Sequence, residues 1–235
     1  QETIAGTNNS CAGPDGIPFI AYRIFSHVAA PILQRCLAFL ADGGLPPPDY
    51  NWARLFLIPK NDSLNPLDNR PISVTNADNR ILAFSLVNAL LPSLSDVIHE
   101  AQTGFVRGRD PTSNIRSLNE GFYSSLSKKE QMYVLFLDTK KAFDSIDHDF
   151  IIAVLNQLGL PPWVSRVVGG LLNNVMVKPV IGGPDSGMIP IERGLKQGCP
   201  LSPILFVLCY DPLIMAILTG VPEAEPFGMA DDLAV

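Results

Sequence analysis

The closing segment, FGMADDLAV, places two adjacent carboxylates, Asp231 and Asp232, between short apolar arms. Apolar arms around a small polar centre are typical of a β-hairpin, so we expect both carboxylates at a hairpin tip. Like charges close to buried strands destabilise a fold unless positive charge lies near them. The segment therefore predicts a strand pairing that leaves its carboxylates open to cations.

A second segment, QMYVLFLD, is an almost unbroken apolar run that ends at Asp138. Runs of this length are typical of buried strands. A sheet that pairs this strand with the closing hairpin would bring Asp138 and Asp231 together. Two Mg²⁺ ions about 3.5–4 Å apart would balance these charges and suit phosphoryl transfer, because Mg²⁺ prefers oxygen ligands. The plainer alternative is that the Asp pair favours a turn and Asp138 caps a helix.

The other segments mix helical and extended patterns without regular alternation. WARLFLIPK predicts a strand that ends at Pro59. Helical spacing is found before it, with an expected break at Pro31, and in residues 78–100, with an expected interruption at Pro92. Two more helices are expected, one that starts at His148 and ends just before Gly159, and one from about Pro203 to Leu218. The pattern favours an α+β fold with helices on one face of a mainly antiparallel sheet.

Charge and hydropathy limit the classes of function. A net charge of −6 argues by itself against a nucleic-acid binder. Residues 131–235 carry six Lys or Arg against eleven Asp or Glu, however, and bound divalent cations could neutralise part of this excess. The most apolar stretch, PILFVLCYDPLIMAIL, contains Asp211 and Pro212 and is shorter than the roughly 20 residues that span a bilayer. We therefore expect a buried helix there and no membrane partner.

The termini and cysteines suggest an intracellular piece of a longer polypeptide. The first ten residues have no initiator Met, basic start or apolar stretch, so we expect neither a signal peptide nor a natural beginning. The four cysteines include no C-x-x-C pair, which favours a reduced, non-secreted protein without structural zinc.

Three motifs, FLDTKKAFDSIDH, GLKQGCPLSPILF and MADDLAV, resemble the successive polymerase motifs of reverse transcriptases, particularly those of non-LTR (LINE-type) retrotransposons. Upstream, AGPDGIP, LIPKNDSLNPLDNRPISV and QTGFVRGRDPTSNI resemble the fingers segments of that family in the same order. The resemblance runs from about Gly13 to the end of the chain. It implies an RNA-directed DNA polymerase that adds dNTPs to a primer 3′-hydroxyl during retrotransposon replication.

The same resemblance implies a right-hand polymerase fold that comprises fingers and a partial palm, with an antiparallel palm sheet packed on helices and the thumb missing. Residues 1–53 would form an N-terminal helical extension of the fingers, 54–130 the fingers and 131–235 the incomplete palm. Residues 54–235 together would form the reverse transcriptase domain. We expect such a fragment to be inactive without the rest of the palm and the thumb.

The resemblance also implies a catalytic triad. Asp138, Asp231 and Asp232 match the acidic residues that hold two Mg²⁺ ions, with Mn²⁺ as an alternative, and Asp138 and Asp231 are the first candidates for ligands. Phe143 matches the bulky residue that lies against the sugar of the incoming nucleotide. Its ring would exclude a 2′-hydroxyl and so favour deoxynucleotides. An ordinary core position is the alternative for Phe143.

Other matched residues would bind nucleotide. Lys60 and Arg70 match fingers positions that reach the triphosphate or the template, where guanidinium and ammonium groups suit phosphate. Gln197 and Gly198 match the loop that lies against the templating base and the incoming nucleotide, where Gly permits close backbone approach. Ordinary surface charges and a plain loop before a helix are the alternatives.

Arg107 and Arg109 in GFVRGRD are matched to contacts with the template backbone, against the alternative of a solvated loop. Met229 stands where the family commonly has an aromatic residue, usually Tyr, so primer contacts are expected to differ. The implied partners are an RNA template, a DNA primer, dNTPs and the rest of the parent polyprotein, including a thumb and, as a further candidate, an endonuclease. The expected location is cytoplasm and nucleus.

Two other functions are consistent with parts of the pattern. An RNA-dependent RNA polymerase shares the palm carboxylates, but selection of ribonucleotides needs a polar group at the sugar, and Phe143 is apolar. A degenerate, domesticated copy that binds RNA without catalysis is the alternative from a different class. The presence of Asp138, Asp231 and Asp232 argues against loss of catalysis.

Overall fold

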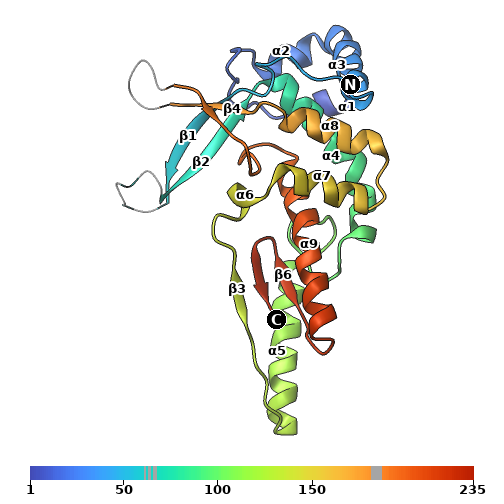
Figure 1. The fold of residues 1–235 in the computed structure, drawn as a ribbon, viewed down its shortest axis with the longest axis vertical. Coiled ribbons are helices and arrows are strands. Elements are labelled where there is room, and N and C mark those ends of the chain that lie inside the picture. Colours follow the sequence, from blue (N-terminus) through green and yellow to red (C-terminus); the bar gives the residue numbers. More distant parts are fainter. Residues whose placement is uncertain (61, 63–64, 66–67, 181–186) are drawn as a thin grey trace. The chain divides into compact units, whose positions relative to one another are not determined.

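The computed structural model describes residues 1–235 except 61, 63–64, 66–67 and 181–186, and the chain divides into two compact units (Figure 1). Unit 1 comprises residues 1–89 and 143–202, and unit 2 comprises residues 90–142 and 203–235. Each unit is therefore built from two separate stretches of chain. The expected divisions after residues 53 and 130 do not coincide with these units, and the fingers and palm boundaries stay predictions.

Unit 1 contains a four-stranded sheet in the order β2-β1-β4-β5. β1 (Ala53–Pro59) pairs antiparallel with β2 (Asn69–Thr75) along its whole length and parallel with β4 (Met176–Pro179). β5 (Ile189–Pro190) is antiparallel to β4. The predicted strand that ends at Pro59 is confirmed.

The helices of unit 1 pack mainly against one another. α8 contacts both α3 and α7, and Ile151 of α7 and Val167 and Val168 of α8 are fully buried. α6 begins at the last residue of unit 2, and α4 begins in unit 1 and ends in unit 2. The bounds are α1 (Glu2–Ala5), α2 (Phe19–Ile24), α3 (Ser26–Ala41), α4 (Ala77–Val97), α6 (Ala142–Ser145), α7 (His148–Gln157) and α8 (Pro162–Leu172).

Unit 2 contains a three-stranded antiparallel sheet in the order β3-β7-β6, with helices α5 (Pro111–Lys128) and α9 (Ser202–Gly220). Its strands are β3 (Phe136–Asp138), β6 (Phe227–Met229) and β7 (Asp232–Ala234). Phe206 and Ile214 of α9 and Leu233 of β7 are buried and belong to its core. The α+β class, the closing hairpin and the helix after Pro203 are thus confirmed.

Two expected helix interruptions are wrong. Pro31 and Pro92 lie inside α3 and α4, and the break in the first helical region falls at Phe25 instead. A proline removes one intrahelical hydrogen bond, and buried neighbours on the same helix can offset that loss. The helix expected from His148 to just before Gly159 is α7. At its N-terminus, the Asp147 carboxylate accepts a hydrogen bond from the backbone N–H of Asp149.

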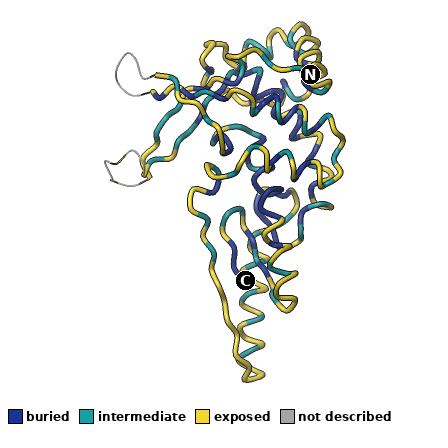
Figure 2. Tube along the Cα trace, in the orientation of Figure 1, coloured by how far each residue is buried: buried dark blue, intermediate teal, exposed yellow. Residues whose placement is uncertain are grey.

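The prediction of a buried strand before Asp138 is also wrong. β3 is only three residues long and lies at the edge of its sheet, and Tyr133 and Phe136 expose 82% and 74% of their surface. Figure 2 shows this stretch and α5 largely exposed, and α5 has no buried residue. Met132 and Val134 are 37% exposed, so the described part of the chain covers this apolar segment only in part.

Two described helices, α4 and α9, are long and apolar enough by length and composition to cross a membrane. The buried share of their most apolar windows is 44% for α4 and 50% for α9. In α9, the Asp211 carboxylate accepts a hydrogen bond from the backbone N–H of His99, 2.8 Å away. About half of the most apolar window of α9 is therefore covered within the described part of the chain, and Asp211 has a hydrogen-bond partner there.

Candidate active site

The three acidic residues lie at one end of the unit 2 sheet. In the antiparallel pairing of β3 with β7, Asp138 is directly opposite Asp232. Side chains of directly opposite residues share a face, with Cβ atoms about 4.5–5.5 Å apart. Met229 pairs with Asp232, so Ala230 and Asp231 form the two-residue turn. Asp231 is therefore at the predicted tip, whereas Asp232 is the first residue of β7.

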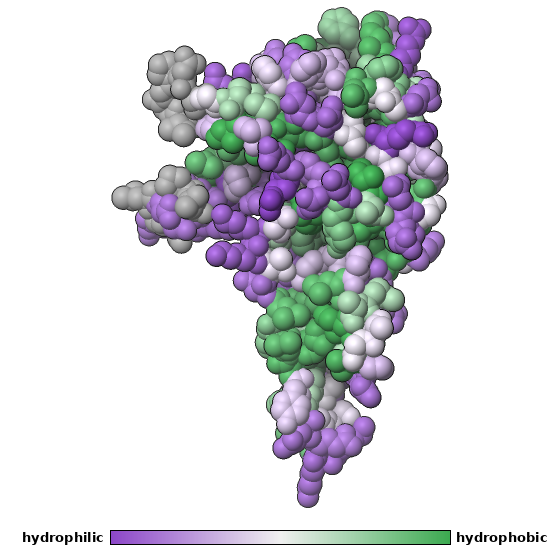
Figure 3. All heavy atoms as spheres, viewed as in Figure 1, coloured by the Kyte–Doolittle hydropathy of each residue, from purple (hydrophilic) through white to green (hydrophobic). Residues whose placement is uncertain are grey.

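A cavity of about 350 Å³ lies between α5 and this sheet. Asp138 and Asp232 line it together with apolar side chains that include Ile115, Phe136 and Met229. Figure 3 shows an apolar surface where Figure 1 places β3 and β6. Two carboxylates thus face a largely apolar groove, and the half-exposed Met229 supplies part of its wall.

Tyr210 of α9 connects the two segments that carry the carboxylates. Its hydroxyl donates to the backbone oxygen of Asp231, 3.3 Å away, and lies 3.2 Å from Oγ1 of Thr139, the residue after Asp138. The tyrosine is buried and its ring stacks on Phe206 with 5.4 Å between centroids. Sequence reasoning missed this residue, because a tyrosine inside an apolar helix carries no local signal of such a bridge.

The assignment of Asp138, Asp231 and Asp232 as joint metal ligands stays a prediction. Among the described residues, no group of three or more His, Cys, Asp or Glu side chains is placed to hold a metal ion. What the structure provides is the opposed pair of Asp138 and Asp232, with Asp231 next in the turn. Carboxylate oxygens are the donors that Mg²⁺ accepts, usually few in number and supplemented by water and phosphate. The donor chemistry therefore suits Mg²⁺.

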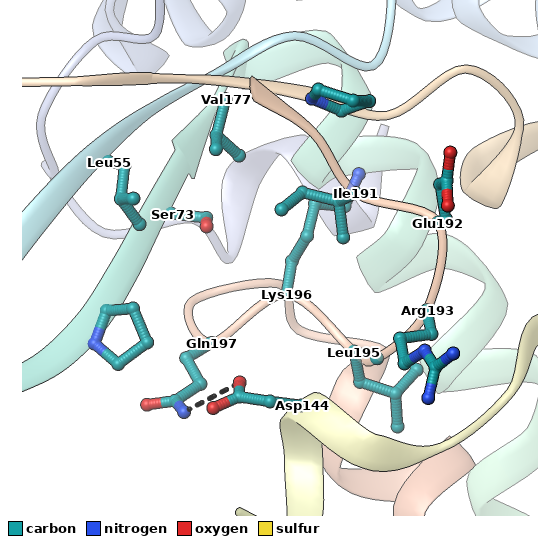
Figure 4. Close-up of a pocket in the computed structure, with 13 residues that line it drawn as sticks. Leu55, Ser73, Asp144, Val177, Ile191, Glu192, Arg193, Leu195, Lys196 and Gln197 are labelled. Carbon is teal, nitrogen blue, oxygen red and sulfur yellow. Dashed lines mark hydrogen bonds between the residues drawn. The ribbon is translucent and has the colours of Figure 1, made fainter. Parts of the chain in front are cut away.

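Gln197 and Gly198 lie in unit 1, on a loop that forms hydrogen bonds with β2 and with Asp144 of α6. The N–H of Ser73 in β2 donates to the Gln197 backbone oxygen at 2.7 Å. The Gln197 amide donates to the Asp144 carboxylate at 3.3 Å, as Figure 4 shows. The N–H of Leu195 donates to the backbone oxygen of the half-buried Phe143 at 2.7 Å. The structure thus brings Phe143 and Gln197 to the same part of unit 1.

This loop borders a cavity of about 410 Å³ in unit 1 (Figure 4). Leu55, Ser73 and Val177 line its sheet side, and the loop contributes charged and polar groups that include Lys196 and Gln197. Lys196 is buried, its Nζ is 3.4 Å from the backbone oxygen of Leu171, and burial lowers the pKa of its ammonium group. The predicted base-facing loop therefore also encloses a buried lysine that sequence reasoning did not single out.

We expect Lys196 to make unit 1 less stable at neutral pH than at alkaline pH. The pKa of Lys196 in the folded state is below the unfolded value of 10.5. Between these two pKa values the unfolded chain binds more protons than the folded chain, so the free energy of unfolding increases as pH rises toward 10.5. Lys196→Met should raise the urea midpoint at pH 7 and flatten its rise between pH 7 and 10, measured by fluorescence of Trp52 and Trp163, which both lie in unit 1. Lys178→Met, at an exposed site, should keep the pH dependence. An equally steep profile in Lys196→Met would contradict this expectation.

Gly198 is held where a side chain does not fit. Its φ is +112°, and an added Cβ would lie 2.6 Å from the backbone oxygen of Ser73. We expect Gly198→Ala to lower the free energy of unfolding of unit 1 by at least about 2 kcal/mol, because backbone strain and a clash add. Urea denaturation followed by tryptophan fluorescence measures this. Gly187→Ala, where a Cβ meets nothing within 4 Å, is the matched control and should change little.

Lys60 and Arg70 lie at the same end of the β1–β2 pair. Arg70 is opposite Ile58 in the register, and Lys60 directly follows the last residue of β1. Both side chains are exposed. The structure therefore brings together the two cations that the sequence assigned to phosphate or template.

Arg109 has a structural role that its motif did not suggest. Its guanidinium donates four hydrogen bonds of 2.6–2.8 Å to backbone oxygens at the end of α4 and in the following turn, those of Ser95, Ile98, His99 and Gln102. Cationic groups stabilise helix C-termini in this way. Arg107, two residues earlier, is exposed.

The two arginines should therefore differ in function. If Arg107 contacts the template backbone, as the resemblance implies, Arg107→Ala should weaken RNA binding and reduce the slope of log K against log salt by about one. Arg109→Ala should mainly speed amide hydrogen exchange in residues 95–104, because their carbonyl partner is removed. Fluorescence anisotropy at several salt concentrations and hydrogen-exchange mass spectrometry separate the two effects. A reduced salt slope with unchanged exchange in Arg109→Ala would assign Arg109 to the template instead.

Comparison with known proteins identifies the family of the matched segment. Residues 58–235 match the family described as "Reverse transcriptase (RNA-dependent DNA polymerase)". The chain is 28% identical to the "Transposon TX1 uncharacterized 149 kDa protein" of Xenopus laevis over 93% of its length, and 33% identical to the "Retrovirus-related Pol polyprotein from type-1 retrotransposable element R2" of Popillia japonica over 83%. It spans only 17% and 28% of those two proteins.

A solved structure supports the fold alone. The telomerase of Candida tropicalis, truncated from its C-terminal domain, matches with a TM-score of 0.53 at 16% identity. The match covers 81% of this chain and 44% of the telomerase chain. The fold is therefore one that the telomerase structure shares.

Proposed function

We propose that this chain, which belongs to the reverse transcriptase (RNA-dependent DNA polymerase) family, carries fingers and palm segments of an RNA-directed DNA polymerase in a non-LTR retrotransposon polyprotein. The parent would add dNTPs to the 3′-hydroxyl of a DNA primer along an RNA template. Relatives whose names contain "retrotransposable element R2" and "mobile element jockey" support this assignment. The family uses divalent metal ions.

The observation that carries the proposal is the register of the unit 2 sheet. It sets Asp138 opposite Asp232 and leaves Asp231 in the adjoining two-residue turn, so residues about ninety positions apart in sequence meet at one sheet end. Carboxylates gathered in this way repel one another unless cations lie between them. A cation site is therefore the chemistry that this end of the sheet supports best.

We propose that Asp138, Asp231 and Asp232 hold two Mg²⁺ ions, for which Mn²⁺ can substitute. The ions, when bound, would activate the primer hydroxyl and stabilise the oxygens of the transferred phosphoryl group. The chain's own residues provide the oxygen donors, and the hairpin turn sets the direction of Asp231. The triphosphate of the nucleotide would complete the coordination.

The other proposed contacts fall mostly in unit 1. Phe143 would select against the 2′-hydroxyl, and Gln197 and Gly198 would face the base pair. The hydrogen bonds from Leu195 to Phe143 and from Ser73 to Gln197 support a common location for them. Lys60 and Arg70, exposed at one end of the β1–β2 pair, would bind the triphosphate or the template.

Primer extension by the full-length parent tests the proposal. The purified protein is given an RNA template, an annealed DNA primer, labelled dNTPs and Mg²⁺ or Mn²⁺, in parallel with rNTPs. We expect DNA products that require both dNTPs and the RNA template. Products formed from rNTPs alone would favour an RNA-dependent RNA polymerase, and RNA binding without any synthesis would favour the non-catalytic alternative.

A further inference from the structure

The side chain of Gln102 is fully buried and forms hydrogen bonds with the turn that carries Asp231. Its Oε1 accepts hydrogen bonds from the backbone N–H of Ala230 at 2.8 Å and of Gly104 at 2.9 Å. Its Nε2 donates to the backbone oxygen of Ala230 at 3.0 Å. One side chain therefore satisfies both backbone polar groups of the residue directly before Asp231.

Ala230 is a residue that needs such support. Its φ of +57° lies in the left-handed region, where an L-residue with a Cβ is less stable than glycine by about 1 kcal/mol. Two-residue hairpin turns require positive φ, and Asn or Gly usually supplies it. Here the sequence has alanine, and the hydrogen bonds with the Gln102 amide stabilise the strained turn.

The segment that carries Gln102 is itself fixed to the hairpin. Gln102 forms a parallel bridge with Gly228 of β6, and the backbone of Ala101 and Thr103 exchanges two 2.8 Å hydrogen bonds with Gly228. An added Cβ on Gly104 would lie 2.3 Å from the backbone nitrogen of Ala230. The segment therefore lies directly against the turn.

Arg109 and Asn114 hold the same segment from its other side. Arg109 donates to the Gln102 backbone oxygen at 2.8 Å. The Asn114 amide donates to Gly228 and lies within hydrogen-bond distance of Ala101 and Thr103. The position of the Gln102 amide is thus set before any ligand binds.

We infer that Gln102 is a positioning residue for nucleotidyl transfer: it fixes the strained peptide at Ala230 and thereby the direction of the Asp231 carboxylate. The inference rests on the proposed polymerase function. Loss of the amide should let the turn relax and displace the carboxylate. Displacements of about 1 Å at a reacting centre can lower rates about 100-fold.

The test uses the full-length parent with Gln102→Met, which keeps side-chain length and removes both polar atoms. Single-nucleotide incorporation on a primed RNA template is measured before the first turnover ends, which gives the incorporation rate, the dNTP Kd and the fraction of active enzyme. We expect the rate to fall about 10- to 100-fold while the Kd and the active fraction stay within about twofold. A purely structural defect would instead lower the active fraction and leave the rate of the remaining enzyme unchanged.

A second substitution provides a rescue. Ala230→Gly removes the strain at the turn, so Gln102→Met combined with Ala230→Gly should recover part of the lost rate. Thr103→Val is the matched control, because its hydroxyl binds Gly228 at the base of the hairpin and does not contact the turn. Thr103→Val should keep a rate close to that of the unmodified protein.

Hydrogen exchange separates the two levels of the proposal. Gln102→Met should speed exchange of the Ala230 amide whether or not the protein polymerises. Faster exchange with an unchanged incorporation rate would overturn the positioning role alone, as would an equal loss of rate in Thr103→Val. Absence of DNA synthesis by the unmodified parent would overturn the proposed function and this inference with it.

Discussion

Asp231→Asn in the full-length parent should abolish RNA-templated DNA synthesis, with the rate of incorporation falling at least about 10³-fold. Asparagine has nearly the same shape but no charge, so the loss reports the missing carboxylate. A bound metal contributes several kcal/mol to stabilisation of the transition state, and each 1.36 kcal/mol corresponds to a factor of ten. The fold should be unaffected, because Tyr210 and Gln102 hold backbone atoms of Asp231 and Ala230.

The measurement is single-nucleotide incorporation at saturating dNTP with Mg²⁺ varied from micromolar to millimolar. Glu223→Gln, on the exposed loop before β6, removes the same charge away from the turn and is the matched control. It should retain nearly the full rate. A control that fell as far as Asp231→Asn would mean that the loss reflects overall charge, and synthesis that survived in Asp231→Asn would remove this residue from the mechanism.

The incorporation rates of Asp138→Asn and Asp232→Asn, compared with that of Asp231→Asn, then show how much each of the three carboxylates contributes to synthesis. We expect Asp138→Asn to match Asp231→Asn, since these two are the first candidates for metal ligands. The register pairs Asp138 with Asp232, however, and both line the groove beside α5. A larger loss in Asp232→Asn than in Asp231→Asn would indicate that the opposed pair is the principal ligand set.

The closing hairpin was predictable because its signals are local. Apolar arms, a two-residue turn and adjacent carboxylates all lie within nine residues, and the sheet forms as expected. The support of the turn was not predictable in this way. Gln102 and Ala230 are far apart in sequence. A glutamine next to small residues has no pattern that predicts a buried side chain hydrogen-bonded to a distant turn. The positive φ of Ala230 indicates this support, and the sequence does not show it.

The exposure of the segment before Asp138 and the backbone contacts of Arg109 could not be predicted from the sequence, for a common reason. An apolar sequence indicates that a segment tends to be buried, but it does not identify the residues that bury it. The stretch that includes Tyr133 and Phe136 was therefore expected to be buried, and in the described structure it is exposed. A motif likewise indicates that an arginine has a function, but it does not identify the groups to which the arginine donates hydrogen bonds. The template contact of Arg109 stays a prediction, and the structure shows its guanidinium hydrogen-bonded to four backbone carbonyls.

Phe143→Val should relax discrimination between deoxynucleotides and ribonucleotides by about 10- to 100-fold. A phenyl ring that fills the space of the 2′-hydroxyl excludes it sterically, and differences of about one to three kcal/mol are typical for such packing. Phe143 is half-buried, and its backbone oxygen accepts a hydrogen bond from Leu195, so the substitution should leave the loop attached. The measured quantity is the ratio of incorporation efficiency for dCTP to that for rCTP.

Phe150→Ala is the matched control, because this phenylalanine belongs to α7 in the same unit and is 45% exposed. It should leave the ratio unchanged. The expected result in Phe143→Val is a higher efficiency with rCTP and a nearly unchanged rate with dCTP, since only the steric block is removed. If both efficiencies fall together, Phe143 supports the fold around Leu195 and does not contact the sugar. If neither changes, selection between the two sugars depends on another residue.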